Sequence, residues 1–283
     1  MRLTLCIKRD LHGVIFLNHL LPRLADHTVE VLLSNKVRPA ETAIPTLAEI
    51  AFLERTLPLE RIFPLIDRSG EAGEWLSFQA LAGKYGYDYR IIDDINSGEA
   101  ITGMQTFAPD LIISARFSHI FKPPAISIPR HGIVNIHPGV LPEFAGLFAP
   151  MRSIAAGRRE LTCSLHFIDA GIDSGPLIAT ANLPYGNDDD LLARIAALYP
   201  RAIPPLLDAI ATLERGDTLQ TITQVRTLRH YHSMPDVSEI EAFYAQGHRF
   251  WQTNTYDALL KRFMPYHSNT TVSVHPYHDG SKL

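Results

Sequence analysis

The chain has 283 residues, of which 46% are hydrophobic and 20% charged, so it can bury a large core and is not a disordered protein. Its 26 Lys and Arg against 30 Asp and Glu give a net charge of −4, which provides no basic excess for a nucleic-acid surface. Two cysteines exclude a disulfide scaffold. No apolar run reaches the ~20 residues that cross a bilayer. We therefore expect a cytoplasmic protein with no membrane partner.

Short β-branched runs alternate with longer amphipathic stretches up to Gly216, a pattern typical of an α/β protein with a mostly parallel sheet. Strands are predicted at 3–7, 29–33, 89–92, 110–115, 132–137, 162–168 and 177–181. Helices are predicted at 14–25, 44–55, 74–85, 100–107, 149–156 and 189–214. Because Pro200 lies inside the last of these, we expect that helix to break near residue 200.

The pattern changes after Gly216, where 218–226 predicts a strand and 236–245 a short amphipathic helix. Aromatic and His residues then become dense, and we expect them to contribute to an acceptor pocket or a subunit contact. They include Tyr231, Tyr244, Phe250 and Trp251. We predict a catalytic domain of residues 1–206 and a C-terminal appendage of residues 207–283 that packs on it.

Polar side chains mark the end of the strand at 132–137. Asn135 and His137 share one face of this strand, because successive side chains alternate, and Pro138 ends it. Ligands of open α/β sheets bind at the carboxyl ends of parallel strands, so these groups are candidate site residues. The alternative is that the amide and the imidazole only satisfy loop carbonyls.

A second polar segment follows the strand at 162–168. It is a loop rich in Gly and Asp that runs from Asp169 to Gly175 and can bring backbone amides and one carboxylate close to a ligand. A His with a carboxylate partner and a neighbouring amide donor is suited to acid/base work and to oxyanion stabilisation.

These two segments resemble the motifs of the folate-dependent formyltransferases. The matching stretches are Asn135-Ile136-His137-Pro138 with Leu141-Pro142 and Gly146, and Ile168-Asp169-Ala170-Gly171-Ile172-Asp173-Ser174-Gly175-Pro176. The family includes enzymes that formylate glycinamide ribonucleotide, methionyl-tRNA, sugar nucleotides and hydroxyornithine. The resemblance, over about residues 28–214, implies a Rossmann-like formyltransferase domain in which Asn135, His137 and Asp173 are catalytic.

The resemblance also implies the reaction. An amine or hydroxylamine attacks the formyl carbon of 10-formyltetrahydrofolate, the co-substrate, and Asn135 and His137 donate hydrogen bonds to the resulting oxyanion. Asp173 holds His137, directly or through water, and favours its protonated form. Backbone groups of two loops hold the folate, here Phe117, Ser118, His119, Ile120 and Phe121, and Ala170, Gly171 and Ile172. The alternative to a folate contact is ordinary core packing for Phe117, Ile120 and Phe121. For His119 the alternative is a position on the surface.

Two departures from the family pattern bear on the acceptor. Residues 8–13 lack the Gly-Ser-Asn phosphate loop of ribonucleotide-accepting members, and Gly139 replaces a common Ser. We therefore predict a small amino-acid-derived acceptor, such as hydroxyornithine in siderophore biosynthesis. The alternatives are an amino-sugar nucleotide, glycinamide ribonucleotide, and, last, methionyl-tRNA, for which the C-terminal appendage is too neutral.

Other activities and another cellular location remain alternatives. A formyltetrahydrofolate hydrolase is one, although its relatives carry an extra N-terminal regulatory domain; a folate- or nucleotide-binding module without activity is another. The pairs His230 with His232 and His275 with His278 lack further metal ligands, so we predict no metal site. The C-terminal Ser281-Lys282-Leu283 would suggest a peroxisome only in a eukaryote. No oligomeric state is predicted.

Overall fold

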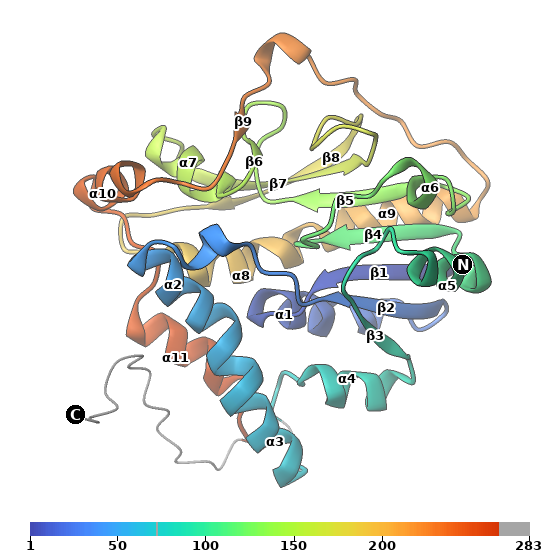
Figure 1. The fold of residues 1–283 in the computed structure, drawn as a ribbon, viewed down its shortest axis with the longest axis horizontal. Coiled ribbons are helices and arrows are strands. Elements are labelled where there is room, and N and C mark those ends of the chain that lie inside the picture. The colour runs from blue at the N-terminus through green and yellow to red at the C-terminus, as the bar shows by residue number, and fades with distance from the viewer. Residues whose placement is uncertain (72, 266–283) are drawn as a thin grey trace.

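A seven-stranded sheet forms the centre of the computed structural model, which describes residues 1–71 and 73–265 (Figure 1). Its spatial order is β3-β2-β1-β4-β5-β7-β8. The strands are β1 (Arg2–Lys8), β2 (Thr28–Ser34), β3 (Tyr89–Ile92), β4 (Leu111–Ala115), β5 (Ile133–His137), β7 (Glu160–Phe167) and β8 (Leu177–Pro184). All seven predicted strands are confirmed. The strands from β3 to β5 are mutually parallel, and β7 runs antiparallel to both β5 and β8, so the predicted mostly parallel sheet is also confirmed.

Seven helices lie at or close to predicted positions. They are α1 (Leu11–Leu20), α2 (Pro45–Ala51), α4 (Phe78–Tyr85), α5 (Gly98–Phe107), α7 (Ala149–Ala155), α8 (Leu191–Arg201) and α9 (Ile203–Glu214). Two further helices, α3 (Phe63–Ser69) and α6 (Pro123–Ile126), were not predicted. The predicted break near residue 200 lies at Ala202, between α8 and α9. Pro204 and Pro205 occupy the first turn of α9, where a missing N–H leaves no hydrogen bond unmade.

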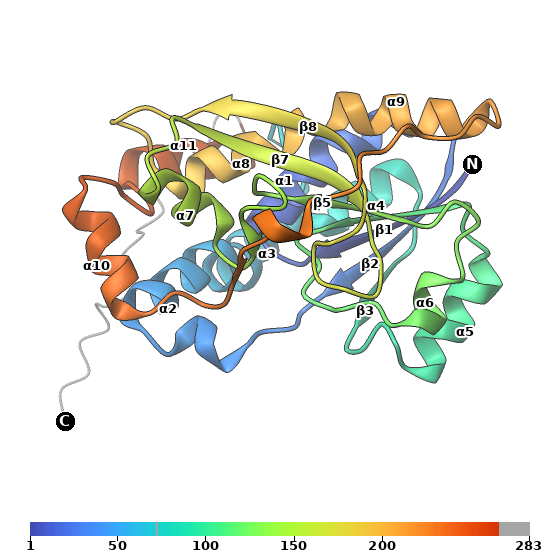
Figure 2. The ribbon, with the colours of Figure 1, turned by 90° about the horizontal axis from the view of Figure 1, so that it is seen from above.

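Two buried clusters cover the two faces of the sheet, because side chains alternate along each strand. On β1, Leu3, Leu5 and Ile7 belong to the larger cluster, which also contains residues of α1 and α8. Cys6 on the same strand points to the smaller cluster, which contains residues of α5 and α6. Figure 2 shows α1, α8 and α9 on one side of the sheet and α5 and α6 on the other.

One long helical segment runs from α2 into α3 beside the carboxyl ends of the strands (Figure 1). Its middle, Phe52–Thr56 and Pro58–Ile62, has the wider hydrogen bonding of a π-helix. Pro58 lacks the N–H that an α-helix needs there and its ring crowds the carbonyl four residues earlier, which accounts for the widened turns. That earlier residue is Glu54, which contributes to the site described below.

The C-terminal segment departs from prediction in part. The predicted strand at 218–226 is wrong: within it only Ile222 pairs, in a single bridge to Leu177 of β8. The predicted helix at 236–245 is confirmed as α10 (Val237–Ala245), whereas α11 (Thr253–Lys261) was not predicted. A short strand, β9 (Tyr231–His232), pairs parallel with β6 (Ala145–Gly146), away from the main sheet.

This segment packs on the main body of the molecule, as expected. The Tyr256 hydroxyl on α11 donates to the carbonyl oxygen of Leu53 at 2.7 Å. Phe263 is fully buried, with its ring centroid 5.1 Å from that of Phe63 and 5.4 Å from that of Trp75. The pair His275 and His278 and the terminal Ser-Lys-Leu lie outside the described residues. Within the described part, no helix combines the length and apolarity that crossing a membrane requires.

Candidate active site

A cavity of about 420 Å³ opens at the carboxyl ends of β1, β4 and β5. The three predicted catalytic residues, Asn135, His137 and Asp173, all line it. So do seven of the eight predicted folate-contacting residues, namely Phe117, Ser118, His119, Ile120, Phe121, Gly171 and Ile172. Ala170 is exposed and does not line the cavity. The structure therefore gathers at one edge of the sheet nearly all the residues that the motifs singled out.

Asn135 is oriented by a histidine of the neighbouring strand. The β5–β7 register places His166 opposite Asn135, and the Asn135 amide nitrogen lies 3.1 Å from His166 Nε2. His166 Nδ1 donates to the carbonyl oxygen of Phe167 at 2.9 Å, so in the neutral ring Nε2 is an acceptor. Burial lowers the pKa of His166, which favours this neutral form. One amide hydrogen of Asn135 is thereby used, and the second remains for a ligand.

His166 is the site residue that the sequence interpretation missed. It had a signal, because Ser164 and His166 are polar on alternate positions of an otherwise apolar strand. The strand pairing that brings His166 to Asn135 is antiparallel, and this pairing was not predicted.

His137 is held by a backbone carbonyl. Its Nε2 donates to the carbonyl oxygen of Phe144 at 2.7 Å, which leaves Nδ1 as the nitrogen that can exchange a proton. The lack of a side chain at Gly139 permits this contact, because a Cβ there would lie 2.8 Å from His137 Nε2 and 2.8 Å from the Phe144 oxygen. The glycine that departs from the family pattern thus accommodates the observed orientation of the imidazole.

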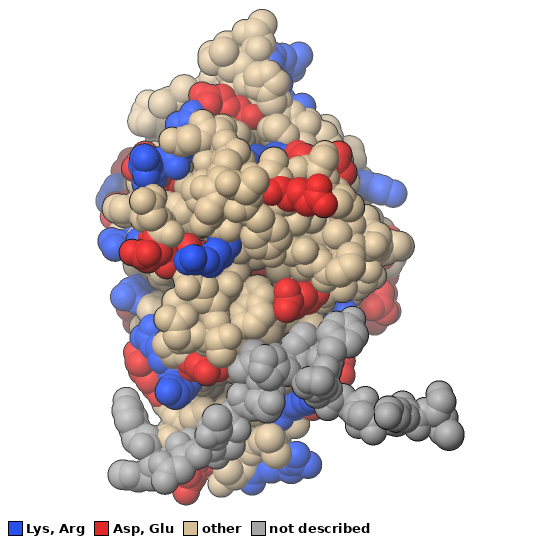
Figure 3. Space-filling view, turned by 90° about the vertical axis from the view of Figure 1, so that its left-hand side faces the viewer, with Lys and Arg blue, Asp and Glu red and all other residues tan. Residues whose placement is uncertain are grey.

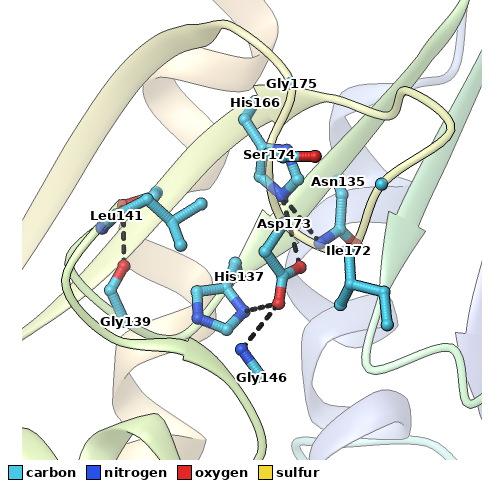
Figure 4. A network of polar contacts seen from close by, with 12 residues as sticks. Asn135, His137, Gly139, Leu141, Gly146, His166, Ile172, Asp173, Ser174 and Gly175 are labelled. Carbon is cyan, nitrogen blue, oxygen red and sulfur yellow. Dashed lines mark hydrogen bonds and ion pairs between the residues drawn. The ribbon is translucent and has the colours of Figure 1, made fainter. Parts of the chain in front are cut away.

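Asp173 lies between the two histidines (Figure 4). Its Oδ2 is 3.6 Å from His137 Nδ1, and its Oδ1 is 3.7 Å from His166 Nε2. The backbone N–H of Gly146 donates to Oδ2 at 2.8 Å. Both distances exceed that of a direct hydrogen bond, so the carboxylate acts on His137 through its charge, whereas the neutral His166 accepts from Asn135.

The backbone is strained around this cavity. Among the described residues, four that are not glycine have positive φ, and three of them line the cavity: Arg116 at 56°, Phe148 at 54° and Asp173 at 51°. This conformation is costly for residues with a Cβ and tends to persist at functional sites, where surrounding contacts hold it in place.

A buried charge network closes one end of the cavity. The Arg116 guanidinium donates to Asp10 Oδ2 at 2.8 and 3.0 Å and to Glu54 Oε2 at 2.7 Å. Although burial raises the pKa of the Glu54 carboxyl, Arg116 and His12 lower it more, and the net pKa lies well below its usual range. Asp10 also caps α1, accepting from the N–H of Gly13 at 2.7 Å. The amino end of α1 is therefore occupied by a carboxylate of the chain itself.

Two further cations at this end, Lys8 and Arg38, are paired with Glu41. Lys8 Nζ lies 3.3 Å from Glu41 Oε2, and Arg38 Nη1 lies 3.5 Å from Glu41 Oε1. Among residues 1–71 and 73–265, no group of three His, Cys, Asp or Glu side chains could hold a metal ion. His232, one of the paired histidines noted above, stacks on Phe144 with a centroid distance of 6.0 Å.

Comparison with known proteins finds formyltransferases among the relatives of this chain. Residues 93–203 match the Formyl transferase family. The chain is 30% identical over 143 residues to phosphoribosylglycinamide formyltransferase of Escherichia coli, a match that covers 48% of this chain and 63% of that protein. It is 33% identical over 119 residues to methionyl-tRNA formyltransferase of Acidithiobacillus ferrooxidans, covering 41% and 38%. The chain thus spans less than two thirds of the length of these curated relatives.

Solved structures share the fold. Glycinamide ribonucleotide transformylase 1 from Symbiobacterium toebii superposes with a TM-score of 0.52 at 21% identity, covering 80% of this chain and 94% of that one. A sugar N-formyltransferase from a Shewanella species gives 0.53 at 16% identity, covering 100% and 95%. Together with the motifs and the family match, these likenesses confirm the resemblance seen in the sequence. Residues 93–203 of this chain are thus the part that matches the formyltransferase family, within a fold that formyltransferases share.

Proposed function

We propose that the protein transfers the formyl group of 10-formyltetrahydrofolate to an amine or hydroxylamine of a small amino-acid-derived molecule, such as hydroxyornithine in siderophore biosynthesis. The observation that carries the proposal is that Asn135, His137 and Asp173 line one cavity. Asp173 Oδ2 lies 3.6 Å from His137 Nδ1 and 2.8 Å from the Gly146 nitrogen, and His137 Nε2 lies 2.7 Å from the Phe144 oxygen. An amide donor, an imidazole and a carboxylate are the groups that acyl transfer to nitrogen requires.

The donor is proposed from the cavity wall and from the relatives. Phe117 to Phe121 and Gly171 to Ile172 provide an aromatic and backbone surface suited to a flat ring with alternating donors and acceptors. The solved structure of a related sugar 3N-formyl transferase, with a TM-score of 0.52, was obtained in the presence of dTDP and 5-N-formyl-THF. A folate that carries a formyl group is therefore the donor class that the family likeness supports.

The proposed chemistry begins with attack of the acceptor nitrogen on the formyl carbon. The carbonyl oxygen becomes an oxyanion. This oxyanion accepts a hydrogen bond from the amide N–H of Asn135 that is not used by His166. His137 can donate to the oxyanion through Nδ1 only as imidazolium, because Nε2 is bound to Phe144. Asp173, 3.6 Å away, stabilises that cation.

The intermediate then collapses. The bond between the formyl carbon and N10 breaks, N10 takes a proton, and the acceptor nitrogen loses one, so that tetrahydrofolate and the formylated acceptor are released. Asp173 and His137 provide the acceptor and donor sites for this proton transfer, directly or through water.

The acceptor class follows from the charge network. A helix amino end is a natural phosphate site, but at α1 the carboxylate of Asp10 already accepts from Gly13 and from Arg116. A phosphate there would have to displace a buried carboxylate from its partners. This argues against ribonucleotide and sugar-nucleotide acceptors that bind by a phosphate at this point.

Paired charges instead suit an acceptor with charges of both signs. Lys8 with Glu41 and Arg116 with Glu54 present a cation and an anion side by side along the cavity, an arrangement that complements an ammonium and a carboxylate of one amino acid. On the face drawn in Figure 3, blue and red residues are interspersed, without the basic field that tRNA binding needs.

The test is an acceptor panel. The protein is incubated with 10-formyltetrahydrofolate carrying a 13C formyl group and with hydroxyornithine, ornithine, an amino-sugar nucleotide, glycinamide ribonucleotide or methionyl-tRNA. We expect the labelled formyl group on hydroxyornithine or another phosphate-free amino acid. Label appearing only on a phosphate-bearing acceptor contradicts the acceptor class, and label appearing only as formate indicates a hydrolase.

A further inference from the structure

Side chains of the C-terminal segment form hydrogen bonds to the backbone of the loop that carries Asp173. The side-chain amide nitrogen of Gln224, which is 8% exposed, donates to the carbonyl oxygens of Asp173 at 3.1 Å and Gly175 at 2.6 Å. Arg229 Nη2 donates to the carbonyl oxygen of Ile172 at 2.7 Å. Three carbonyls of this loop are thus bound by two side chains that lie about fifty residues further along the chain.

The same segment fixes the other partner of Asp173. β9 pairs with β6, so the N–H of Ala145 donates to the His230 oxygen at 3.0 Å and that of Leu147 to the His232 oxygen at 2.8 Å. Between them lies Gly146, whose N–H faces the Asp173 carboxylate. Gly146 has φ of 94°, and a Cβ there would lie 2.2 Å from the His232 oxygen, so the close approach of β9 requires glycine.

The loop itself has few means of holding Asp173. Inside it, Asp169 accepts from the N–H of Gly171 and from the Ser174 hydroxyl, but these bonds close only the loop's own turn. Asp173 has a positive φ of 51°, a conformation that is uncommon for residues with a Cβ although Asp tolerates it better than most. The side chains that bind the backbone of the loop at 172, 173 and 175 come from the C-terminal segment.

We propose that residues 224–232 are a positioning strap for the proposed catalytic carboxylate, with Gln224 and Arg229 as positioning residues. The strap binds the backbone of the Asp173 loop on one side and, through β9, the donor Gly146 on the other. Gln224 and Arg229 set the distance from the carboxylate to His137 and His166, and neither lines the cavity, whereas Tyr231 of β9 does. The part of this inference that concerns catalysis rests on the proposed function.

The first test needs no activity. Amide hydrogen–deuterium exchange is followed at Gly146, whose N–H donates to the Asp173 carboxylate. The wild type is compared with Gln224→Met, which keeps the volume of the side chain and loses both bonds, and with Gln220→Met, an exposed glutamine of the same segment. We expect about tenfold faster exchange at Gly146 in Gln224→Met and no change in the control. Unchanged exchange in Gln224→Met would overturn the proposal.

Arg229 gives a second, independent variant. Arg229→Ala should accelerate amide exchange at Gly146, and Arg229→Lys, which retains a cationic donor, should restore part of the protection. Arg226→Ala is the matched control, since that arginine is exposed and its side chain makes no hydrogen bond to the described residues. Equal exchange in Arg229→Ala and Arg226→Ala would contradict a role for Arg229.

The second test links the strap to Asp173 by a double-mutant cycle. We expect Gln224→Met to lower kcat about tenfold in the wild-type background, with a smaller change in KM, because a misplaced catalytic group costs rate more than binding. In the Asp173→Asn background the same substitution should have little further effect, since its target has gone. A loss that persists undiminished in that background would mean that Gln224 acts on the fold in general, and the proposal would fall.

The two tests separate the strap from the proposed function. If no acceptor is formylated by the wild type, the proposed function fails, and the exchange measurement alone still decides whether the strap holds the loop. If formylation occurs and exchange at Gly146 is unchanged in the variants, the strap fails and the proposed function stands.

Discussion

At His137 a single hydrogen bond restricts the possible chemistry. Because Nε2 donates to the carbonyl oxygen of Phe144, Nδ1 is the nitrogen left to face Asp173 and a reacting group. Asn135 is restricted in the same way, since His166 uses one of its two amide hydrogens. Asn135 therefore keeps one amide hydrogen for the transition state, and His137 can donate only through Nδ1, as imidazolium.

We expect Asn135→Ala and His137→Ala each to lower kcat by about 100-fold or more, the size typical of a lost oxyanion donor. Folate affinity should remain close to that of the wild type, because both donors act on a charge that exists only after attack. Steady-state kinetics together with a folate titration test this. His131→Ala, a histidine in the loop before β5, is the control, and near-wild-type turnover in both site variants would contradict the assignment.

Replacing Asp173 tests the electrostatic part of the mechanism. Asp173→Asn has a similar shape and can still accept from Gly146, but it removes the negative charge 3.6 Å from His137 Nδ1. A carboxylate stabilises imidazolium, so its loss disfavours the form of His137 that can donate, and turnover should fall at neutral pH while substrates still bind.

The measurement is nitrogen NMR of the His137 imidazole in both proteins. We expect a smaller protonated fraction in Asp173→Asn at the same pH. An unchanged or larger protonated fraction would remove the electrostatic role and leave Asp173 only the positioning of a water molecule.

At the residue scale, side-chain chemistry was easier to predict than geometry. The resemblance pointed to Asn135, His137 and Asp173, which the structure brings together. His166 was missed because its partnership with Asn135 depends on the antiparallel pairing of β5 and β7. The use of Gly139 was also missed, because it depends on how closely Phe144 approaches the imidazole, a distance set by tertiary packing.

At the scale of elements, the strands with buried side chains were predicted correctly, whereas the exposed segment 218–226 was wrongly predicted to be a strand. Residues 218–226 have the β-branched composition of a strand, but Ile222 is 72% exposed and Val225 is 55% exposed, so no apolar face is buried to support pairing. The helix α11 was missed because its sequence gives only a weak helical pattern. Only Tyr256 and Leu260 of this helix are buried, which is a weak sequence pattern, and its stability comes from docking near α8 and Leu53.

Three elements meet at Arg116, which follows β4 and binds Asp10 between β1 and α1 and Glu54 on the π-helical segment. Arg116→Met would leave both carboxylates buried without their cation. We expect this to lower the free energy of unfolding by about 3–5 kcal/mol near pH 7, the usual cost of an uncompensated buried charge.

The pH dependence of that loss has a definite sign. In the wild type, Glu54 has a lowered pKa in the folded state, so its stabilisation is present above the unfolded pKa and is lost as pH falls through the folded one. Without Arg116, the main group that lowers the Glu54 pKa is gone and His12 and Lys8 remain, so the variant has less of this stabilisation to lose on acidification. Denaturant unfolding should therefore show a smaller deficit at about pH 3 than at about pH 7. A deficit that grows toward low pH would contradict this account.

At the scale of the whole molecule, the C-terminal appendage shares the core of the main domain. Phe263 and Tyr256 belong to the same buried cluster as Leu3 of β1 and Leu17 of α1. The division into residues 1–206 and 207–283 remains a prediction about function; residue 206 lies within α9. Because one core joins the two parts, we expect them to unfold together.

Phe263→Ala tests this. Removing a fully buried ring that contacts Phe63 and Trp75 should cost about 3–5 kcal/mol of the free energy of unfolding. Calorimetry should show a single transition in both proteins, shifted to lower temperature in the variant. Tyr244→Ala, an aromatic that is 43% exposed, is the control. Two separate transitions, of which Phe263→Ala shifts only one, would show that the appendage folds independently.

The central claim is that this cavity moves a formyl group from a folate to an amino-acid nitrogen, and one measurement tests it most directly. Wild type and His137→Ala are each mixed with 10-formyltetrahydrofolate labelled with 13C in the formyl group and with hydroxyornithine, and the products are followed by NMR. We predict that the wild type yields 13C-formyl hydroxyornithine and tetrahydrofolate in equal amounts, and that His137→Ala yields neither above the uncatalysed rate. Release of label as formate, or transfer that is the same in both proteins, would contradict the account.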